Sequence, residues 1–118
     1  MIILKIIIIS WIVFTESRSE CDLTKQAVAS TVSNRSKNGW EWVLKRGQFS
    51  LEIPKRIYAA DILIISKCIK YGVLATLEVI PKRFRNNWYF LSGNKMKPKW
   101  AIKNKLILKT KNMKFYRR

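Results

Sequence analysis

Residues 55–71 of the chain read KRIYAADILIISKCIKY, a stretch without glycine or proline. Its apolar side chains recur at helical spacing and form one stripe, made up of Ile57, Ala60, Ile62, Leu63, Ile65, Cys68 and Ile69. Lys67 and Lys70 suit the negative end of a helix dipole, and Gly72 is a typical residue just past a helix. The pattern therefore predicts a long helix that ends at Gly72.

Shorter elements are predicted on both sides of this helix. Residues 22–37 have apolar positions at helical spacing and precede Asn38-Gly39, which predicts a second helix that stops there. Five further segments have strand-like patterns: residues 40–45, 48–53, 73–80, 88–91 and 106–108. Together they predict a small α+β domain with two helices packed on an antiparallel or mixed sheet of about 3–5 strands.

The N-terminal segment, residues 1–14, reads MIILKIIIISWIVF and is followed by the polar run TESRSE. It has the length of the apolar part of a secretory signal peptide, with cleavage near Ser17 or Ser19. It is shorter than the roughly 20 apolar residues that a transmembrane helix needs. Two interpretations stay open: a cleaved signal, or an apolar extension over residues 1–20 that lies against a neighbouring protein. In both, residues 21–118 form the basic domain.

The interpretation of residues 1–14 as a cleaved secretory signal leads to two further expectations. The two cysteines, Cys21 and Cys68, could form a disulfide, and Asn34-Arg35-Ser36 is an acceptor sequence for N-glycosylation. The alternative for the cysteines is two isolated thiols, with Cys68 buried in a helix.

The charge of the chain points to a polyanionic partner. Lys and Arg number 24 against 7 Asp and Glu, which gives a net charge of +17. A small domain with this charge repels itself unless an anion neutralises it. Phosphate backbones are the first candidate, anionic membranes the second and acidic proteins the third. The chain has no His and 2 Cys, which are too few to build a zinc site from the usual Cys and His ligands, and we expect no metal and no cofactor.

The second half of the chain carries most of this charge. No acidic residue follows Glu78, and aromatic residues alternate with the cations, namely Phe84, Trp88, Tyr89, Phe90, Trp100, Phe115 and Tyr116. Cations bind phosphates and aromatic rings stack on bases, so the mixture is typical of RNA binding, although Trp88, Phe90 and Trp100 also suit a core.

The candidate RNA-binding residues form two groups. The smaller group is Arg35, Lys37, Lys55 and Arg56. The larger group is Lys82, Arg83, Arg85, Lys95, Lys97, Lys99, Lys103, Lys105, Lys109, Lys111, Lys114, Arg117 and Arg118. Lys103, Lys105 and Lys109 are expected along one polar strand edge, so charge reversal at Lys103 and Lys105 should weaken binding.

Catalytic patterns are not apparent in the sequence. Asp61 and Glu78 have no second carboxylate nearby in sequence with which to form an acid–base pair, and no glycine-rich phosphate loop is present. Both acids are expected to face solvent or to pair with lysines. The chain is therefore interpreted as a non-enzyme without a small-molecule substrate.

Four segments in order resemble the first domain of the universal small-subunit ribosomal protein eight family. They are NRSKNG (34–39), FSLEIPKR (49–56), CIKYGVLATLEV (68–79) and LKTKNMKFYRR (108–118). The likeness covers residues 27–116, and the family's second domain would follow after residue 118. It implies a structural protein that binds ribosomal RNA.

The expectation from the sequence is therefore a structural constituent of the small ribosomal subunit. The richness in Ile, Lys and Asn suggests AT-rich coding, as in a mitochondrial genome, and hence a mitochondrial location. The expected partners are ribosomal RNA and, at the apolar N-terminal segment, neighbouring ribosomal proteins. The alternative is a secreted cationic protein that acts on a membrane or an extracellular polyanion after signal cleavage.

Overall fold

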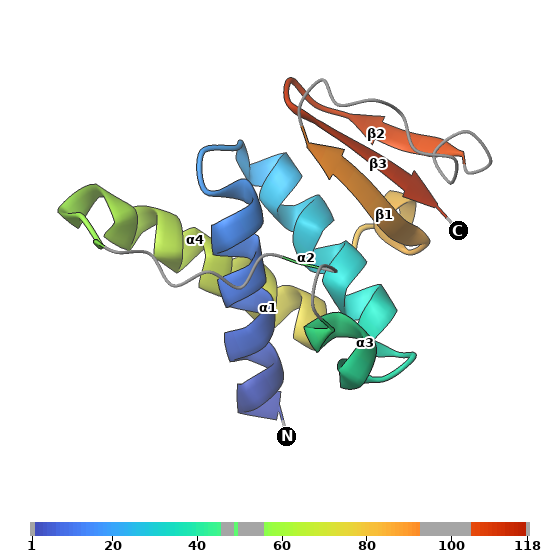
Figure 1. The fold of residues 1–118 in the computed structure, drawn as a ribbon, viewed down its shortest axis with the longest axis horizontal. Helices are drawn as coiled ribbons and strands as arrows, with labels where there is room; N and C mark the ends of the chain where they lie inside the picture. Colours follow the sequence, from blue (N-terminus) through green and yellow to red (C-terminus); the bar gives the residue numbers. More distant parts are fainter. Residues whose placement is uncertain (1, 46–48, 50–55, 93–104, 118) are drawn as a thin grey trace.

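A computed structural model describes residues 2–45, 49, 56–92 and 105–117. The elements, in chain order, are α1 (Ile2–Ser17), α2 (Asp22–Ser36), α3 (Trp40–Leu44), α4 (Ala59–Thr76), the 3₁₀ turn η1 (Lys82–Phe84), β1 (Asn87–Ser92), β2 (Leu106–Lys109) and β3 (Met113–Arg117) (Figure 1). Three long helices and a three-stranded antiparallel sheet confirm the α+β class and the predicted size of the sheet.

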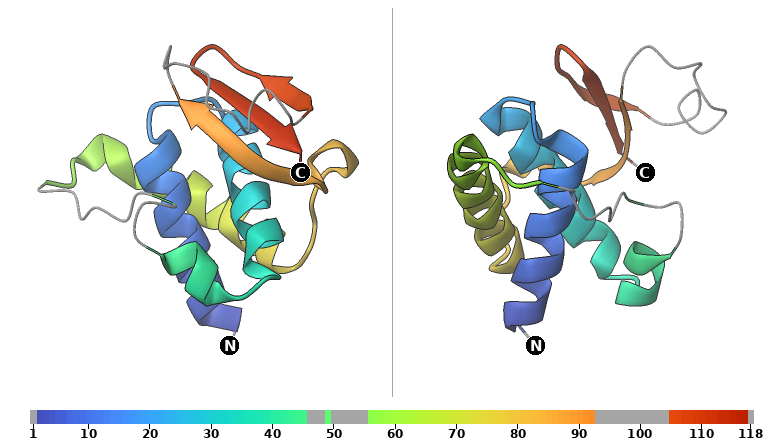
Figure 2. Two further views of the ribbon diagram at one scale, coloured as in Figure 1. Left: turned by 45° about the vertical axis from the view of Figure 1, so that its right-hand side comes forward. Right: turned by 60° about the vertical axis from the view of Figure 1, so that its left-hand side comes forward.

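Helix α2 lies between the other two long helices and the sheet. It contacts α1 and α4 on one side and β1 on the other (Figure 2). Its apolar residues Val28 and Val32 are fully buried, and they belong to the same core as Ile12 of α1 and Phe115 of β3. One continuous core therefore joins the helices to the sheet. The prediction of a helix over residues 22–37 is confirmed.

Helix α1 is part of this core. Ile9, Ile12 and Val13 are almost completely buried, and α1 packs along α2 and α4 of the same chain. The expectation that the apolar segment lies against a neighbouring protein is therefore wrong for its inner face. Its outer face, which includes Ile3 and Ile7, is exposed. Within the described residues, no helix combines the length and the apolar character needed to cross a membrane.

Helix α4 runs past its predicted end. It continues through Gly72 to Thr76, so the predicted strand over residues 73–80 is wrong. Gly72 lies where α4 crosses α1: a Cβ atom there would lie 3.2 Å from the backbone oxygen of Ile6 and the backbone nitrogen of Ser10. The glycine serves a close helix crossing rather than a helix end. Glu78 instead takes the left-handed conformation after the helix, with a φ of 60°.

Two other predicted strands have different outcomes. Residues 40–44 form the short helix α3, so the predicted strand over residues 40–45 is wrong. A short apolar run cannot be assigned to strand or helix by its periodicity alone. The predicted strand over residues 48–53 lies outside the described residues, apart from Phe49.

The sheet has the order β1-β3-β2, with both pairs antiparallel. The predicted strands over residues 88–91 and 106–108 are confirmed as parts of β1 and β2. The central strand β3 was not predicted. Phe115 of β3 faces Phe90 of β1 and Leu108 of β2, and this row packs against the core. Lys114 and Tyr116 alternate with Phe115 along β3 and so lie on the opposite face, where Tyr116 is also buried.

Candidate nucleic-acid interface

The β2–β3 hairpin carries a concentration of positive charge. Lys109 of β2 is the direct antiparallel partner of Lys114 of β3. Like charges placed opposite each other destabilise a sheet. Lys111 lies exposed in the turn between them, and the backbone N–H of Arg117 donates to the carbonyl of Lys105 at 3.0 Å at the other end of the hairpin. Residues 105–117 thus carry five cations and no acid.

Apolar packing and the turn hold this repulsive arrangement together. Phe115 and Met113 are buried on the inner face, which places the intervening Lys114 on the outer face. At the turn, the backbone N–H of Thr110 donates to the carbonyl of Met113 at 2.8 Å, and the hydroxyl of Thr110 accepts from the N–H of Met113 at 3.2 Å. The fold therefore presents the lysines outward although they repel one another.

A second cationic group lies at η1. Lys82, Arg83 and Arg85 are all exposed there. The side-chain amide of the buried Asn34 donates to the carbonyls of Phe84 and Asn87, at 3.0 and 2.9 Å. These two bonds fix the end of η1 and the start of β1 beside the C-terminal end of α2.

The same end of α2 carries two cations of the smaller predicted group, Arg35 and Lys37, in two different environments. Lys37 is exposed and lies 3.7 Å from the carboxylate of Glu78, so the prediction that Glu78 faces solvent or pairs with a lysine is confirmed. Arg35 is half-buried, and its guanidinium lies 5.0 Å from the ring centroid of Phe49 and 5.9 Å from that of Tyr89. Burial lowers the pKa of Arg35. Arg35 therefore contributes to packing as well as to charge.

The structure describes some of the predicted RNA-binding residues and not others. The structure brings together Lys105, Lys109, Lys111, Lys114 and Arg117 on the hairpin, and Lys82, Arg83 and Arg85 at η1. Arg56 is exposed just before α4. Lys55, Lys95, Lys97, Lys99, Lys103 and Arg118 lie outside the described residues. The pairing of Lys109 with Lys114 was missed because β3 was not predicted.

The aromatic residues serve mainly the core. Phe84, Phe115 and Tyr116 are buried, so they cannot stack on bases in this structure. Trp88 and Tyr89 are half-buried. Trp100 lies outside the described residues. The predicted surface of cations interleaved with stacking rings is therefore corrected to a surface in which the cations predominate.

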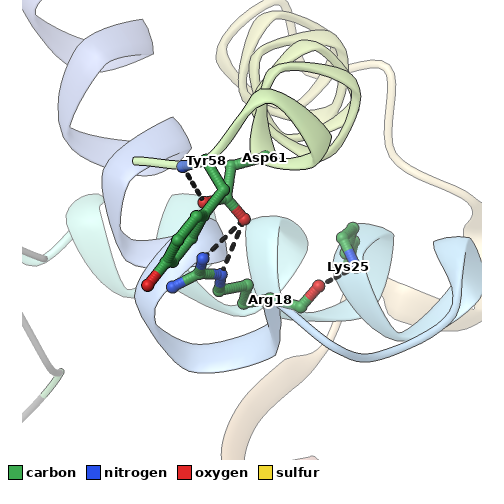
Figure 3. Close-up of polar contacts among 4 residues, drawn as sticks. All are labelled: Arg18, Lys25, Tyr58 and Asp61. Carbon is green, nitrogen blue, oxygen red and sulfur yellow. Dashed lines mark hydrogen bonds and ion pairs between the residues drawn. The ribbon is translucent and has the colours of Figure 1, made fainter. Parts of the chain in front are cut away.

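A polar cluster closes the turn between α1 and α2 (Figure 3). Arg18 donates to one oxygen of Asp61 from Nε at 3.1 Å and from a terminal nitrogen at 2.5 Å. The other oxygen accepts the backbone N–H of Tyr58 at 2.7 Å. These contacts, first that of Tyr58 and then that of Arg18, lower the pKa of Asp61. The prediction that Asp61 faces solvent or pairs with a lysine is wrong: it is buried and bonded to arginine.

The two cysteines differ in environment. Both are free thiols; Cys68 is buried in α4, as predicted, and Cys21 is exposed at the start of α2. Burial raises the pKa of Cys68 to about 11. A hydrogen bond with the Thr24 hydroxyl lowers the pKa of Cys21 below its ordinary value, and the two atoms lie 3.2 Å apart.

We expect Cys21 to react with iodoacetamide at least about tenfold faster than Cys68 at mildly alkaline pH. The thiolate is the reacting species; the raised pKa of Cys68 keeps its thiol protonated there, and the lowered pKa of Cys21 has the opposite effect. Mass spectrometry of tryptic peptides after timed quenching measures both rates. In denaturant the two rates should converge, and equal rates in the native protein would contradict the burial of Cys68.

The acceptor sequence Asn34-Arg35-Ser36 is not available for a glycan in this fold. Asn34 is 5% exposed, and its side-chain nitrogen makes the two hydrogen bonds that fix η1. A glycan on that nitrogen would break both bonds.

Comparisons with known proteins do not place the chain in a family. No family model, no curated protein and no solved structure matches it. Within the described residues, no three His, Cys, Asp or Glu side chains gather as a metal site would require. The functional argument therefore rests on the cationic hairpin and its surroundings.

Proposed function

We propose that this chain is a non-enzymatic RNA-binding protein that contacts RNA phosphates through the β2–β3 hairpin and η1. The observation that carries the proposal is the direct pairing of Lys109 with Lys114 in a hairpin with five cations and no acid. Such a pair costs stability in the free protein and becomes favourable once phosphates lie between or over the two lysines. Solubility alone would be served by mixed charges.

The particle that we propose is the small subunit of a mitochondrial ribosome. The net charge of +17 suits a protein embedded in ribosomal RNA, and the order of the four quoted segments resembles the small-subunit family. One of these segments, residues 68–79, differs from the expected helix, glycine and strand, because α4 continues through Gly72. The proposal of RNA binding therefore has stronger support than that of the particular particle.

The packing of α1 supports this proposal over the secreted alternative. Cleavage near Ser17 or Ser19 would remove Ile9, Ile12 and Val13, which are almost completely buried in the core. A mature protein without α1 would expose the facing side of α2 and α4 to water.

In density-gradient sedimentation of a native lysate, we expect the chain to travel with a ribonucleoprotein particle and to leave it only at high salt. The physical reason is that phosphate contacts release counterions, so their affinity falls steeply as salt rises. Mass spectrometry of each fraction locates the chain and reads its N-terminus.

Treatment of the lysate with ribonuclease is the control for that measurement. It should move the chain to the top of the gradient. A chain that stays at the top in untreated lysate overturns the proposal of RNA binding. A chain that sediments with RNA apart from small-subunit proteins retains RNA binding and overturns the ribosomal location.

A further inference from the structure

An apolar face covers the side of the molecule formed by α1 and α4. The side chains that define it are Ile7 and Trp11 on α1, Ile57 just before α4, and Ile69 on α4, which are exposed and line one groove. Ile57 is 62% exposed, Ile7 51% and Ile69 45%. Adjacent exposed apolar side chains on two packed helices indicate an interaction surface rather than scattered surface residues.

The apolar face is hollowed between the two helices. A groove of about 490 Å³ is lined by Ile6, Ser10 and Phe14 from α1 and by Ile65, Cys68 and Ile69 from α4. This volume lies within the range of sites that take small molecules, about 300–1,000 Å³. The hydroxyl of Ser10 is buried in this groove and has no hydrogen-bond partner among the residues that the structure describes.

Cations accompany the apolar face. Lys5, Arg56 and Lys70 are exposed on the segments that form it. The acids of these segments, Glu16 and Asp61, are half-buried and buried, respectively. A second copy of this chain would bring another charge of +17 against the same surface, so self-association is opposed by repulsion. The partner that fits the apolar face therefore has an apolar surface bordered by negative charge.

We propose that the apolar face docks on the surface of an anionic lipid bilayer. The exposed aliphatic side chains enter the boundary of the acyl chains, and the lysines extend to the headgroups. Trp11 is exposed at the rim of the groove, and its amphipathic ring suits the level of the headgroups. Fluid acyl chains also fill the groove at Ser10, which a flat protein surface would leave empty.

The placement of the two surfaces makes this inference independent of RNA binding. Helix α2 separates α1 and α4 from the sheet, so the apolar face and the cationic hairpin lie on different sides of the molecule (Figure 2). One molecule can therefore occupy a bilayer surface and an RNA at the same time.

Vesicle flotation with the full chain tests the proposal. Vesicles of phosphatidylcholine are compared with vesicles of phosphatidylcholine and phosphatidylglycerol in equal parts. We expect flotation with the anionic vesicles, and at least about tenfold weaker partition into the neutral ones. The variant Ile7→Gln/Ile57→Gln/Ile69→Gln should lose about tenfold in partition, because insertion scales with buried apolar area.

A matched triple variant, Leu44→Gln/Leu77→Gln/Val79→Gln, removes three exposed apolar side chains that belong neither to the apolar face nor to the cationic hairpin. It should float as the wild type does, and both triple variants should bind RNA unchanged. Wild-type protein that does not float overturns the proposal. Flotation unchanged in the first variant also overturns it, because charge alone would then explain binding. If the lipid-free wild type is a dimer and the first triple variant is a monomer, the lipid proposal is overturned in favour of a protein interface.

Discussion

The double substitution Lys109→Glu/Lys111→Glu is expected to lower the affinity for RNA about a hundredfold at low salt. Two phosphate contacts are lost and two repulsive carboxylates face the RNA. The slope of log affinity against log salt should therefore become shallower by about 2. Titration of a fluorescent RNA by anisotropy, repeated over a series of salt concentrations, measures both quantities.

The same substitution should leave the fold at least as stable as before. The new carboxylate at position 109 stands opposite Lys114, which replaces a repulsive cross-strand pair by an attractive one. Such pairs are worth about 0.2–1 kcal/mol. A lower affinity with an equal or higher melting temperature separates loss of an RNA contact from loss of structure.

The variant Lys5→Glu/Lys70→Glu is the matched control, because it changes the net charge equally on the side of α1 and α4. It should keep most of the RNA affinity and should weaken binding to anionic vesicles instead. An equal loss of RNA affinity in both double variants would show that only net charge matters, and that the hairpin is not a site.

The predicted reversal at Lys103 and Lys105 illustrates how far the sequence defines this site. Composition locates the charge in the second half of the chain, and β2 is recognisable from its apolar run. The sequence pattern does not give the register in which β2 pairs with β3. Only the pairing of β2 with β3 shows that Lys109 and Lys114 face each other, whereas Lys103 lies outside the described residues. A turn signal was present in Lys111-Asn112, between LILK and MKFY.

The fold shows the same division between local and tertiary information. The helix over residues 22–36 and two strands follow from local patterns, and these predictions are confirmed. Gly72 looks locally like a helix end, but its role depends on the backbone of α1, which lies more than 60 residues earlier in the chain. Asp61 looks like a surface acid, and only the approach of Arg18 shows why it is buried. Contacts between distant residues decide both cases.

Lys25→Met is expected to destabilise the protein by about 3 kcal/mol and to lower its melting temperature by about 15 °C. Lys25 is 2% exposed, and its ammonium donates to the carbonyls of Ser17 at 2.8 Å and Arg18 at 3.2 Å. A third bond goes to the carbonyl of Glu20. Three donors thus meet three acceptors at the negative end of the α1 dipole. Methionine preserves the apolar stem but leaves these carbonyls without the charge that neutralises them.

The neighbourhood of Lys25 makes the effect larger than that of an ordinary hydrogen bond. The carbonyl that Lys25 binds on Arg18 belongs to the residue whose guanidinium holds Asp61, so one ammonium helps to position the link between α1 and α4 (Figure 3). We therefore expect Lys25→Met to loosen the contact of α1 with α4 and to increase alkylation of Cys68 in the native protein, because burial raises the pKa of Cys68 more than the ammonium of Lys25, which the variant lacks, lowers it. Thermal unfolding followed by circular dichroism gives the stability, and peptide mass spectrometry gives the alkylation.

Lys111→Met, at an exposed lysine in the hairpin turn, is the control and should change stability by less than about 0.5 kcal/mol. Equal stabilities of the two variants would mean that the α1–α2 turn holds without the buried ammonium, and that apolar packing along α2 alone keeps α1 in place.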